Sequence, residues 1–164
     1  EMNRELESLM GRAKELTRFT NQLVNFLKNK EGEKTRAFNI IHDVGMVSDY
    51  VIGLINEAEK AITIIMPKEH WDTMTPILKT VESDAKITIL TNISENKATT
   101  LPPNVKVEKT REEIDFTVIF NDKYHGIIIP KDNNYALCIH SPDFFKNIIL
   151  QAMRSRYGRK IRAL

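Results

Sequence analysis

Residues 115–122 read DFTVIFND, an apolar run with an aspartate at its start and the pair Asn-Asp at its end. An apolar run that turn-forming residues bound in this way is typical of a buried β-strand. Two more strands are expected over residues 124–130 and 135–140, and the turn signals NDK and KDNN join the three. The stretch therefore predicts the first strand of a β-meander.

Alternating strands and helices are expected before this meander. Strands are predicted from β-type apolar runs and helices from apolar residues at helical spacing. The predicted strands cover residues 37–42, 61–67, 85–91 and 105–109, and the predicted helices cover residues 44–60 and 68–83. A closing helix begins at Ser141, a good N-cap that is followed by Pro142 and Asp143. This order predicts an α/β sandwich with a mixed sheet.

The first 30 residues carry a heptad pattern. Mostly apolar positions recur from Met2 to Leu27 with alternating spacings of four and three, which is typical of a coiled coil. The expected dimer-interface residues are Leu6, Leu9, Ala13, Leu16, Leu23 and Leu27. The alternative is a long helix that packs on its own domain. Because the polar segment NKEGEKTR follows, we expect a dimerisation helix over residues 1–30 and a second domain over residues 36–164.

Composition excludes several classes of protein. The chain has 24 basic and 22 acidic residues, so its net charge of +2 creates no strong field for nucleic acid or anionic lipid. Its apolar runs are too short to span a bilayer, and we expect no membrane partner. One cysteine, Cys138, excludes an internal disulfide framework, and no secretory signal opens the chain, so a cytoplasmic location is expected.

Common catalytic and cofactor motifs are absent from the sequence. It holds no GxGxxG, GxxxxGK[ST], GxSxG or HExxH pattern. The four histidines, at positions 42, 70, 125 and 140, are scattered singly. Cys138 and His140 share one face of a predicted strand, but two ligands do not complete a zinc site. We therefore expect no cofactor and no metal.

The stretch DFTVIFND has the spacing of a phosphoryl-transfer motif without its chemistry. It resembles the H-x-K-x4-D motif of phospholipase D-type enzymes, with Asp115 at the histidine position, Thr117 at the lysine position and Asp122 at the aspartate position. A carboxylate repels a phosphodiester, and a threonine hydroxyl carries no positive charge to neutralise the transition state. The resemblance implies a phospholipase D-like fold, and the substitutions predict that the protein is not an enzyme.

Nearly the whole chain resembles the TrmB-like family of archaeal transcriptional regulators. The resemblance rests on the INEAEKAITIIMP junction, the aspartate-led strand at residue 115 and the closing SPDFFKNIILQAM helix. It implies a dimerising coiled coil over residues 1–30 and a degenerate phospholipase D-like sensor domain over about 36–164. In that family a winged helix-turn-helix comes first. Because the chain begins within a helical pattern and without methionine, we expect such a domain before Glu1, and DNA binding only through that domain.

The expected function is therefore dimerisation and effector sensing in a transcriptional regulator. The family implies a homodimer and a small-molecule effector, a sugar or another metabolite. Sugar-sensing members continue into a further β-rich domain that is not among these 164 residues. The resemblance alone therefore does not imply that the ligand is a sugar. The domain could also serve only to hold the dimer together.

The candidate ligand-binding residues lie at strand ends. Asp115, Thr117 and Asp122 are the residues at the motif positions. Ligands of open α/β sheets bind at the carboxyl ends of the strands, which adds four residues after or at the end of two predicted strands: Met66, Lys68, Thr91 and Asn92. The alternative is that Asp115 only opens a strand and that Asp122 makes a turn with Asn121.

The C-terminal segment is basic. Its cations are Arg154, Arg156, Arg159, Lys160 and Arg162. They are weak candidates for contact with a nucleic-acid backbone, and they also suit the negative end of the last helix dipole. Two alternatives to the regulator remain: a protein-interaction module that uses this segment, and a phospholipase D-type phosphodiesterase or nuclease.

Overall fold

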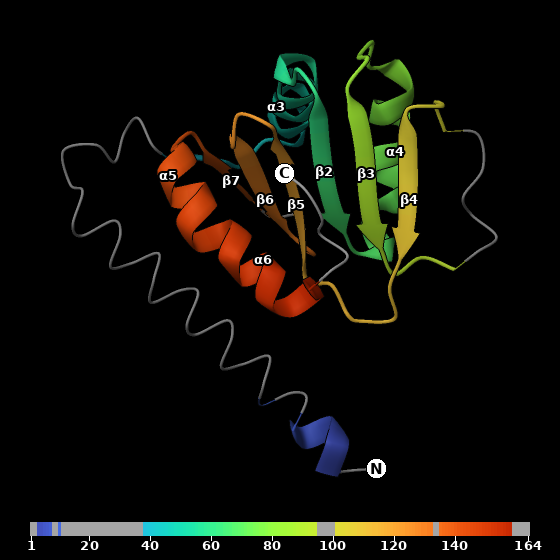
Figure 1. Ribbon diagram of the computed structural model, residues 1–164, viewed down its shortest axis with the longest axis vertical. Helices are drawn as coiled ribbons and strands as arrows, with labels where there is room; N and C mark the ends of the chain where they lie inside the picture. The colour runs from blue at the N-terminus through green and yellow to red at the C-terminus, as the bar shows by residue number, and fades with distance from the viewer. Residues whose placement is uncertain (1–2, 8–9, 11–37, 95–100, 133–134, 159–164) are drawn as a thin grey trace.

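A computed structural model describes residues 3–7, 10, 38–94, 101–132 and 135–158. The described residues form one seven-stranded mixed sheet in the order β1-β7-β6-β5-β2-β3-β4 (Figure 1). The strands are β1 Phe38–Ile41, β2 Ala61–Met66, β3 Lys86–Thr91, β4 Val105–Lys109, β5 Phe116–Asn121, β6 Gly126–Pro130 and β7 Ala136–Ile139. Strands β2, β3 and β4 are parallel to one another, and the other neighbouring pairs are antiparallel.

The register between β2 and β5 decides which residues share an end of the sheet. Ile65 of β2 pairs with Val118 of β5, and Ile62 pairs with Asn121. The start of β5 therefore lies beside the carboxyl ends of β2 and β3, at the lower end of the sheet in Figure 1. We call this end of the strands the Thr117 end and the opposite end the Asp122 end.

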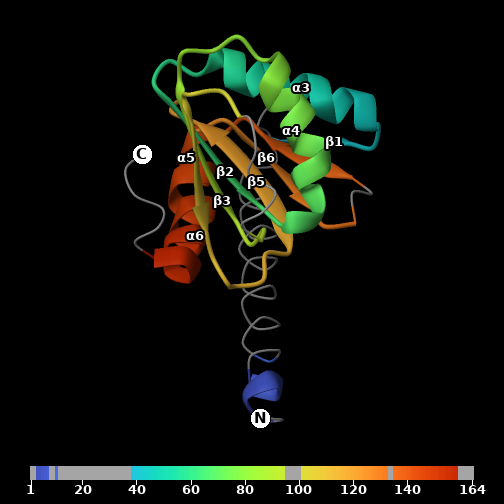
Figure 2. The same ribbon diagram turned by 90° about the vertical axis from the view of Figure 1, so that its right-hand side faces the viewer.

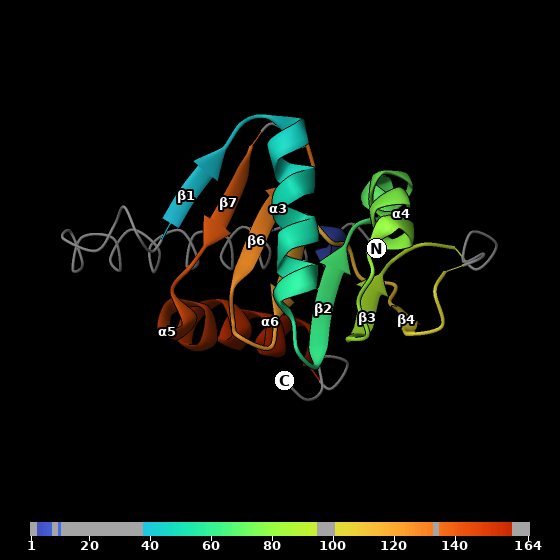
Figure 3. The same ribbon diagram turned by 90° about the horizontal axis from the view of Figure 1, so that it is seen from above.

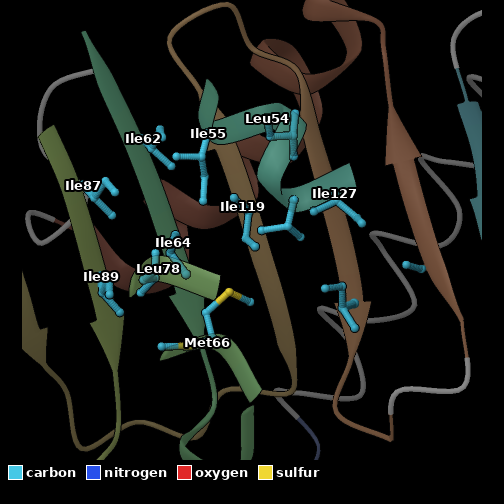
Figure 4. Close-up of a cluster of buried hydrophobic side chains, with 14 of the residues drawn as sticks. Leu54, Ile55, Ile62, Ile64, Met66, Leu78, Ile87, Ile89, Ile119 and Ile127 are labelled. Atoms are coloured by element: carbon cyan, nitrogen blue, oxygen red, sulfur yellow. The ribbon is translucent and has the colours of Figure 1, made fainter. Parts of the chain in front are cut away.

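Helices cover both faces of the sheet (Figures 2 and 3). On one face lie α3 Val44–Glu57, the 3-10 turn η2 Lys68–His70 and α4 Trp71–Thr80. On the other lie α5 Pro142–Phe144, the π-helical turn η4 Phe145–Ile149 and α6 Leu150–Tyr157. Alternation along the strands separates two cores: Ile119 of β5 packs with α3 and α4 (Figure 4), whereas Val118 and Phe120 pack with α5, η4 and α6.

The helix starts follow local capping rules. The Asp43 side chain accepts hydrogen bonds from the backbone N–H groups of Gly45 at 2.7 Å and Met46 at 3.2 Å, and so caps α3. Ser141 caps α5 by accepting from the backbone N–H of Phe144 at 3.3 Å. The predicted start of the closing helix is therefore confirmed.

A close approach between β6 and the closing helix requires a glycine at position 126. Phe145 is fully buried, and its ring centroid lies 4.8 Å from that of Phe120. A Cβ atom at Gly126 would lie 2.7 Å from the Phe145 ring and 2.9 Å from the backbone oxygen of Ile119. The absence of a side chain at Gly126 thus lets the aromatic ring press against the sheet.

The predicted mixed α/β class and its strands and helices are confirmed. The N-terminal helix is described only in part: residues 3–7 and residue 10 are helical, and Leu6 is 58% exposed. The other predicted interface residues, Leu9, Ala13, Leu16, Leu23 and Leu27, lie outside the described residues. The coiled coil and the division at residues 30 and 36 stay predictions.

A membrane-spanning helix would need a long apolar stretch. None of the helices within the described ranges combines the length and the apolar character that crossing a bilayer requires.

Candidate functional site

Thr117 forms a buried hydrogen bond with a histidine from another element. The Thr117 hydroxyl lies 2.5 Å from Nδ1 of His70, in η2, and Nε2 of His70 lies 3.0 Å from the backbone oxygen of Lys131. A carbonyl oxygen can only accept, so Nε2 carries a proton. In the neutral ring, Nδ1 then accepts the hydrogen bond that the Thr117 hydroxyl donates. The contact ties the start of α4 to β5 and to the end of β6.

The same three groups have the order of a nucleophile, a base and an orienting acceptor. In some enzymes that order activates a serine or cysteine nucleophile, provided that substrate can reach its side chain. Here Thr117 is 0% exposed and His70 is 4% exposed. With both side chains buried, the arrangement positions η2 on the sheet and presents no nucleophile to solvent.

Asp115 is paired with a cation from the closing helix. Its carboxylate lies 3.9 Å from the guanidinium group of Arg156, which also donates a hydrogen bond to the backbone oxygen of Glu113 at 3.0 Å. The Asp115 backbone oxygen accepts from Lys131 N–H at 3.0 Å. The position that carries the nucleophilic histidine in the phospholipase D-type motif thus carries a carboxylate that helps to hold α6 against the sheet end.

The four candidates at or after the ends of β2 and β3 also lie at the Thr117 end: Met66, Lys68, Thr91 and Asn92. Met66 is fully buried, and the backbone N–H of Lys68 donates to Oδ1 of Asn92 at 2.8 Å, which links the ends of β2 and β3. Thr91 is 0% exposed and, by alternation with Ile89, points toward the α4 face. Its hydroxyl has no hydrogen-bond partner among the described residues. A buried hydroxyl without a partner is rare in folded proteins.

Asp122 lies away from the other candidates. It follows β5, five strand residues beyond Thr117, or about 17 Å at the usual rise. Its carboxylate accepts hydrogen bonds from the backbone N–H groups of Glu59 at 3.1 Å and Lys60 at 2.9 Å. These bonds fasten the connection between α3 and β2, so the structure brings together the other six candidates and places Asp122 at the opposite end in a turn contact.

The described part of the basic segment is only partly open to solvent. Arg154 is exposed, whereas Arg156 is engaged by Glu113 and Asp115 with 24% of its side chain exposed. Arg159, Lys160 and Arg162 lie outside the described residues. Contact with nucleic acid through this segment stays a prediction.

His70 is the site residue that sequence reasoning did not select. Its partners Thr117 and Lys131 lie 47 and 61 positions away in the chain, so no local motif links them. The available signal was its position four residues after the end of a buried strand, at the edge where the other candidates were expected.

Comparison with known proteins supports the fold. No protein-family model matches the chain, and no curated protein matches it. Among solved structures, the chain is similar to TrmBL2, an archaeal chromatin protein whose structure shows a novel mode of DNA binding, with a TM-score of 0.54 and 10% identity over 99% of this chain and 67% of that one. It is also similar to NucT from Helicobacter pylori, with a TM-score of 0.50 and 12% identity over 74% of this chain and 97% of that one. At these identities the likeness establishes a shared α/β fold.

Proposed function

We propose that this chain is the dimerising and effector-sensing part of a transcriptional regulator and that it has no catalytic activity. The fold similarity to TrmBL2, which extends over 99% of this chain, supports the regulator class. The observation that carries the proposal is the use of Thr117 in a buried hydrogen bond with His70. A residue locked in this way serves the architecture of the domain.

Phosphoryl transfer needs an exposed nucleophile and positive charge around the phosphate oxygens. At the Thr117 end, the first motif position is the carboxylate of Asp115 and the second is a neutral, buried hydroxyl. The cation nearest to Asp115, Arg156, is engaged with that carboxylate and with a backbone oxygen. These features argue against a phospholipase D-type phosphodiesterase or nuclease.

The effector site we propose is the Thr117 end of the sheet. Its groups that reach the surface are the Asn92 amide, Lys68 and the partly exposed carboxylate of Asp115. These are neutral or mixed-charge hydrogen-bonding groups, which suit a small polar metabolite with hydroxyl groups. The effector would act by binding one arrangement of the dimer more tightly than another.

The transmission we propose runs from this end through the first helix to a DNA-binding domain outside the chain. The homodimer would form through the heptad positions of residues 1–30. DNA would be contacted by that attached domain.

A binding screen with an activity control tests the proposal. The full chain is heated with a panel of sugars and other small metabolites, and a ligand that raises the melting temperature is re-tested on Lys68→Ala, which changes an exposed side chain at this end. We expect at least one such ligand and a reduced shift in the variant. In parallel, the chain is assayed with bis(p-nitrophenyl) phosphate. Hydrolysis by the unaltered chain that His70→Ala abolishes would overturn the non-catalytic assignment.

A further inference from the structure

Two histidines that stand far apart in the sequence face each other at the Asp122 end. Gly126 of β6 pairs with Ile139 of β7, so His125 and His140 occupy the next facing positions of the same antiparallel register. Their ring centroids are 6.4 Å apart, and the ring planes make an angle of 73°. Side chains at directly facing positions of neighbouring strands share one face of the sheet and lie within reach of each other.

Each imidazole is held through its Nδ1 atom by a side chain of α3. Nδ1 of His125 lies 3.1 and 3.2 Å from the two carboxylate oxygens of Glu57, and Nδ1 of His140 lies 3.2 Å from the Tyr50 hydroxyl. Contacts of this kind fix the orientation of a ring and leave Nε2 as the atom that can coordinate an ion.

The buried side-chain amide of Asn121 forms hydrogen bonds with both Glu57 and His125. Asn121 is 0% exposed, and its side-chain N–H groups donate to Glu57 Oε2 at 3.0 Å and to the Leu54 backbone oxygen at 3.2 Å. Its side-chain oxygen accepts from the backbone N–H of His125 at 3.2 Å. One buried residue thus positions both the first histidine and its carboxylate partner.

We propose that His125 and His140 form a two-imidazole site for a divalent transition-metal ion such as Cu²⁺, Ni²⁺ or Zn²⁺. Imidazole nitrogen suits these ions, and both rings are reachable, because His140 is exposed and 29% of the His125 side chain is exposed. The Glu57 carboxylate, which contacts His125, favours a cation over an anion, and the Lys123 ammonium group next to it is paired with Glu59.

The site supplies two protein ligands. Among the described residues, no group of three or more His, Cys, Asp or Glu side chains is placed to hold a metal ion. Water completes the coordination, so the affinity lies below that of a closed four-ligand zinc site. Because the site lies at the opposite end of the sheet from Thr117, it is independent of the proposed effector site.

Copper titration of the full, untagged chain tests the site, with electron paramagnetic resonance as the readout. We expect one bound Cu²⁺ with hyperfine coupling from imidazole nitrogen. His125→Ala and His140→Ala each weaken binding at least tenfold, whereas His42→Ala, which removes an exposed histidine just before α3, leaves the affinity unchanged.

Tyr50→Phe gives a second test that keeps both metal ligands. Loss of the Nδ1 partner is expected to weaken binding about 10-fold to 100-fold without abolishing it. Circular dichroism of each variant shows whether it remains folded. No copper binding by the unaltered chain, or equal weakening by His42→Ala and His140→Ala, overturns the proposal.

Discussion

A hydrogen bond joins the Thr117 hydroxyl to Nδ1 of His70 in a region where both side chains are buried. In the phospholipase D-type motif that Thr117 matches by spacing, this position carries a lysine that holds phosphate. Here the side chain is turned into the domain and joins β5 to the start of α4. This strand position therefore has an architectural use.

Thr117→Val should destabilise the domain. Valine keeps the shape of threonine but leaves Nδ1 of His70 buried without a donor, and an unsatisfied buried polar group costs about 1–3 kcal/mol. Urea unfolding, followed by circular dichroism, measures the change. An unchanged unfolding midpoint would show that the hydrogen bond contributes nothing to stability.

Thr91→Val should have the opposite effect. The Thr91 hydroxyl is fully buried and has no partner among the described residues, so removing it abolishes a desolvation cost of about 1–3 kcal/mol. The same substitution at two positions of the Thr117 end, on β5 and on β3, therefore changes stability with opposite sign. Destabilisation by Thr91→Val would mean that the hydroxyl is hydrogen-bonded.

Gly126→Ala should destabilise the domain by about 1–3 kcal/mol, the usual cost of overpacking. The added methyl group would meet the Phe145 ring and the Ile119 backbone oxygen, and a backbone atom cannot move aside cheaply. Gly53→Ala is the matched control: no atom lies within 4 Å of its Cβ position, and alanine favours the α3 helix by about 1 kcal/mol. Equal effects of the two substitutions on the urea midpoint would contradict the close approach.

Acidification below neutral pH should destabilise the domain in two stages. The folded pKa of His140 is lowered from 6.5, so its contribution is complete above pH 6.5 and declines as the pH falls toward the folded value. The folded pKa of Glu57 is lowered from 4.5, so its contribution is complete above pH 4.5 and is lost as the pH falls through the folded value.

Single substitutions separate the two stages. Urea unfolding from pH 7 to pH 3 should show a flatter upper stage in His140→Asn and a flatter lower stage in Glu57→Gln. An upper stage that persists in His140→Asn would assign it to another group.

Local patterns predicted most of the fold. The apolar runs that form β2 and β3 and the Ser141 cap were recognisable because strand burial and helix capping depend on neighbours in sequence. The contact of Thr117 with His70 was not, because a 3-10 turn after one strand must meet another strand 47 positions later. The facing of His125 and His140 depends on the register of β6 and β7, which sequence spacing alone does not fix. The π-helical turn at Phe145–Ile149 had no sequence signal that we recognised.

The solution mass of the chain tests the proposed regulator most directly, because signal transmission requires two chains joined by the first helix. Light scattering is measured on the full chain, on Leu16→Glu/Leu23→Glu, which places charges in the heptad seam, and on a version that begins at Asn29. We expect a dimer for the full chain and monomers for the other two. A monomeric full chain would contradict dimerisation, and three dimers would place the dimer interface outside the heptad helix.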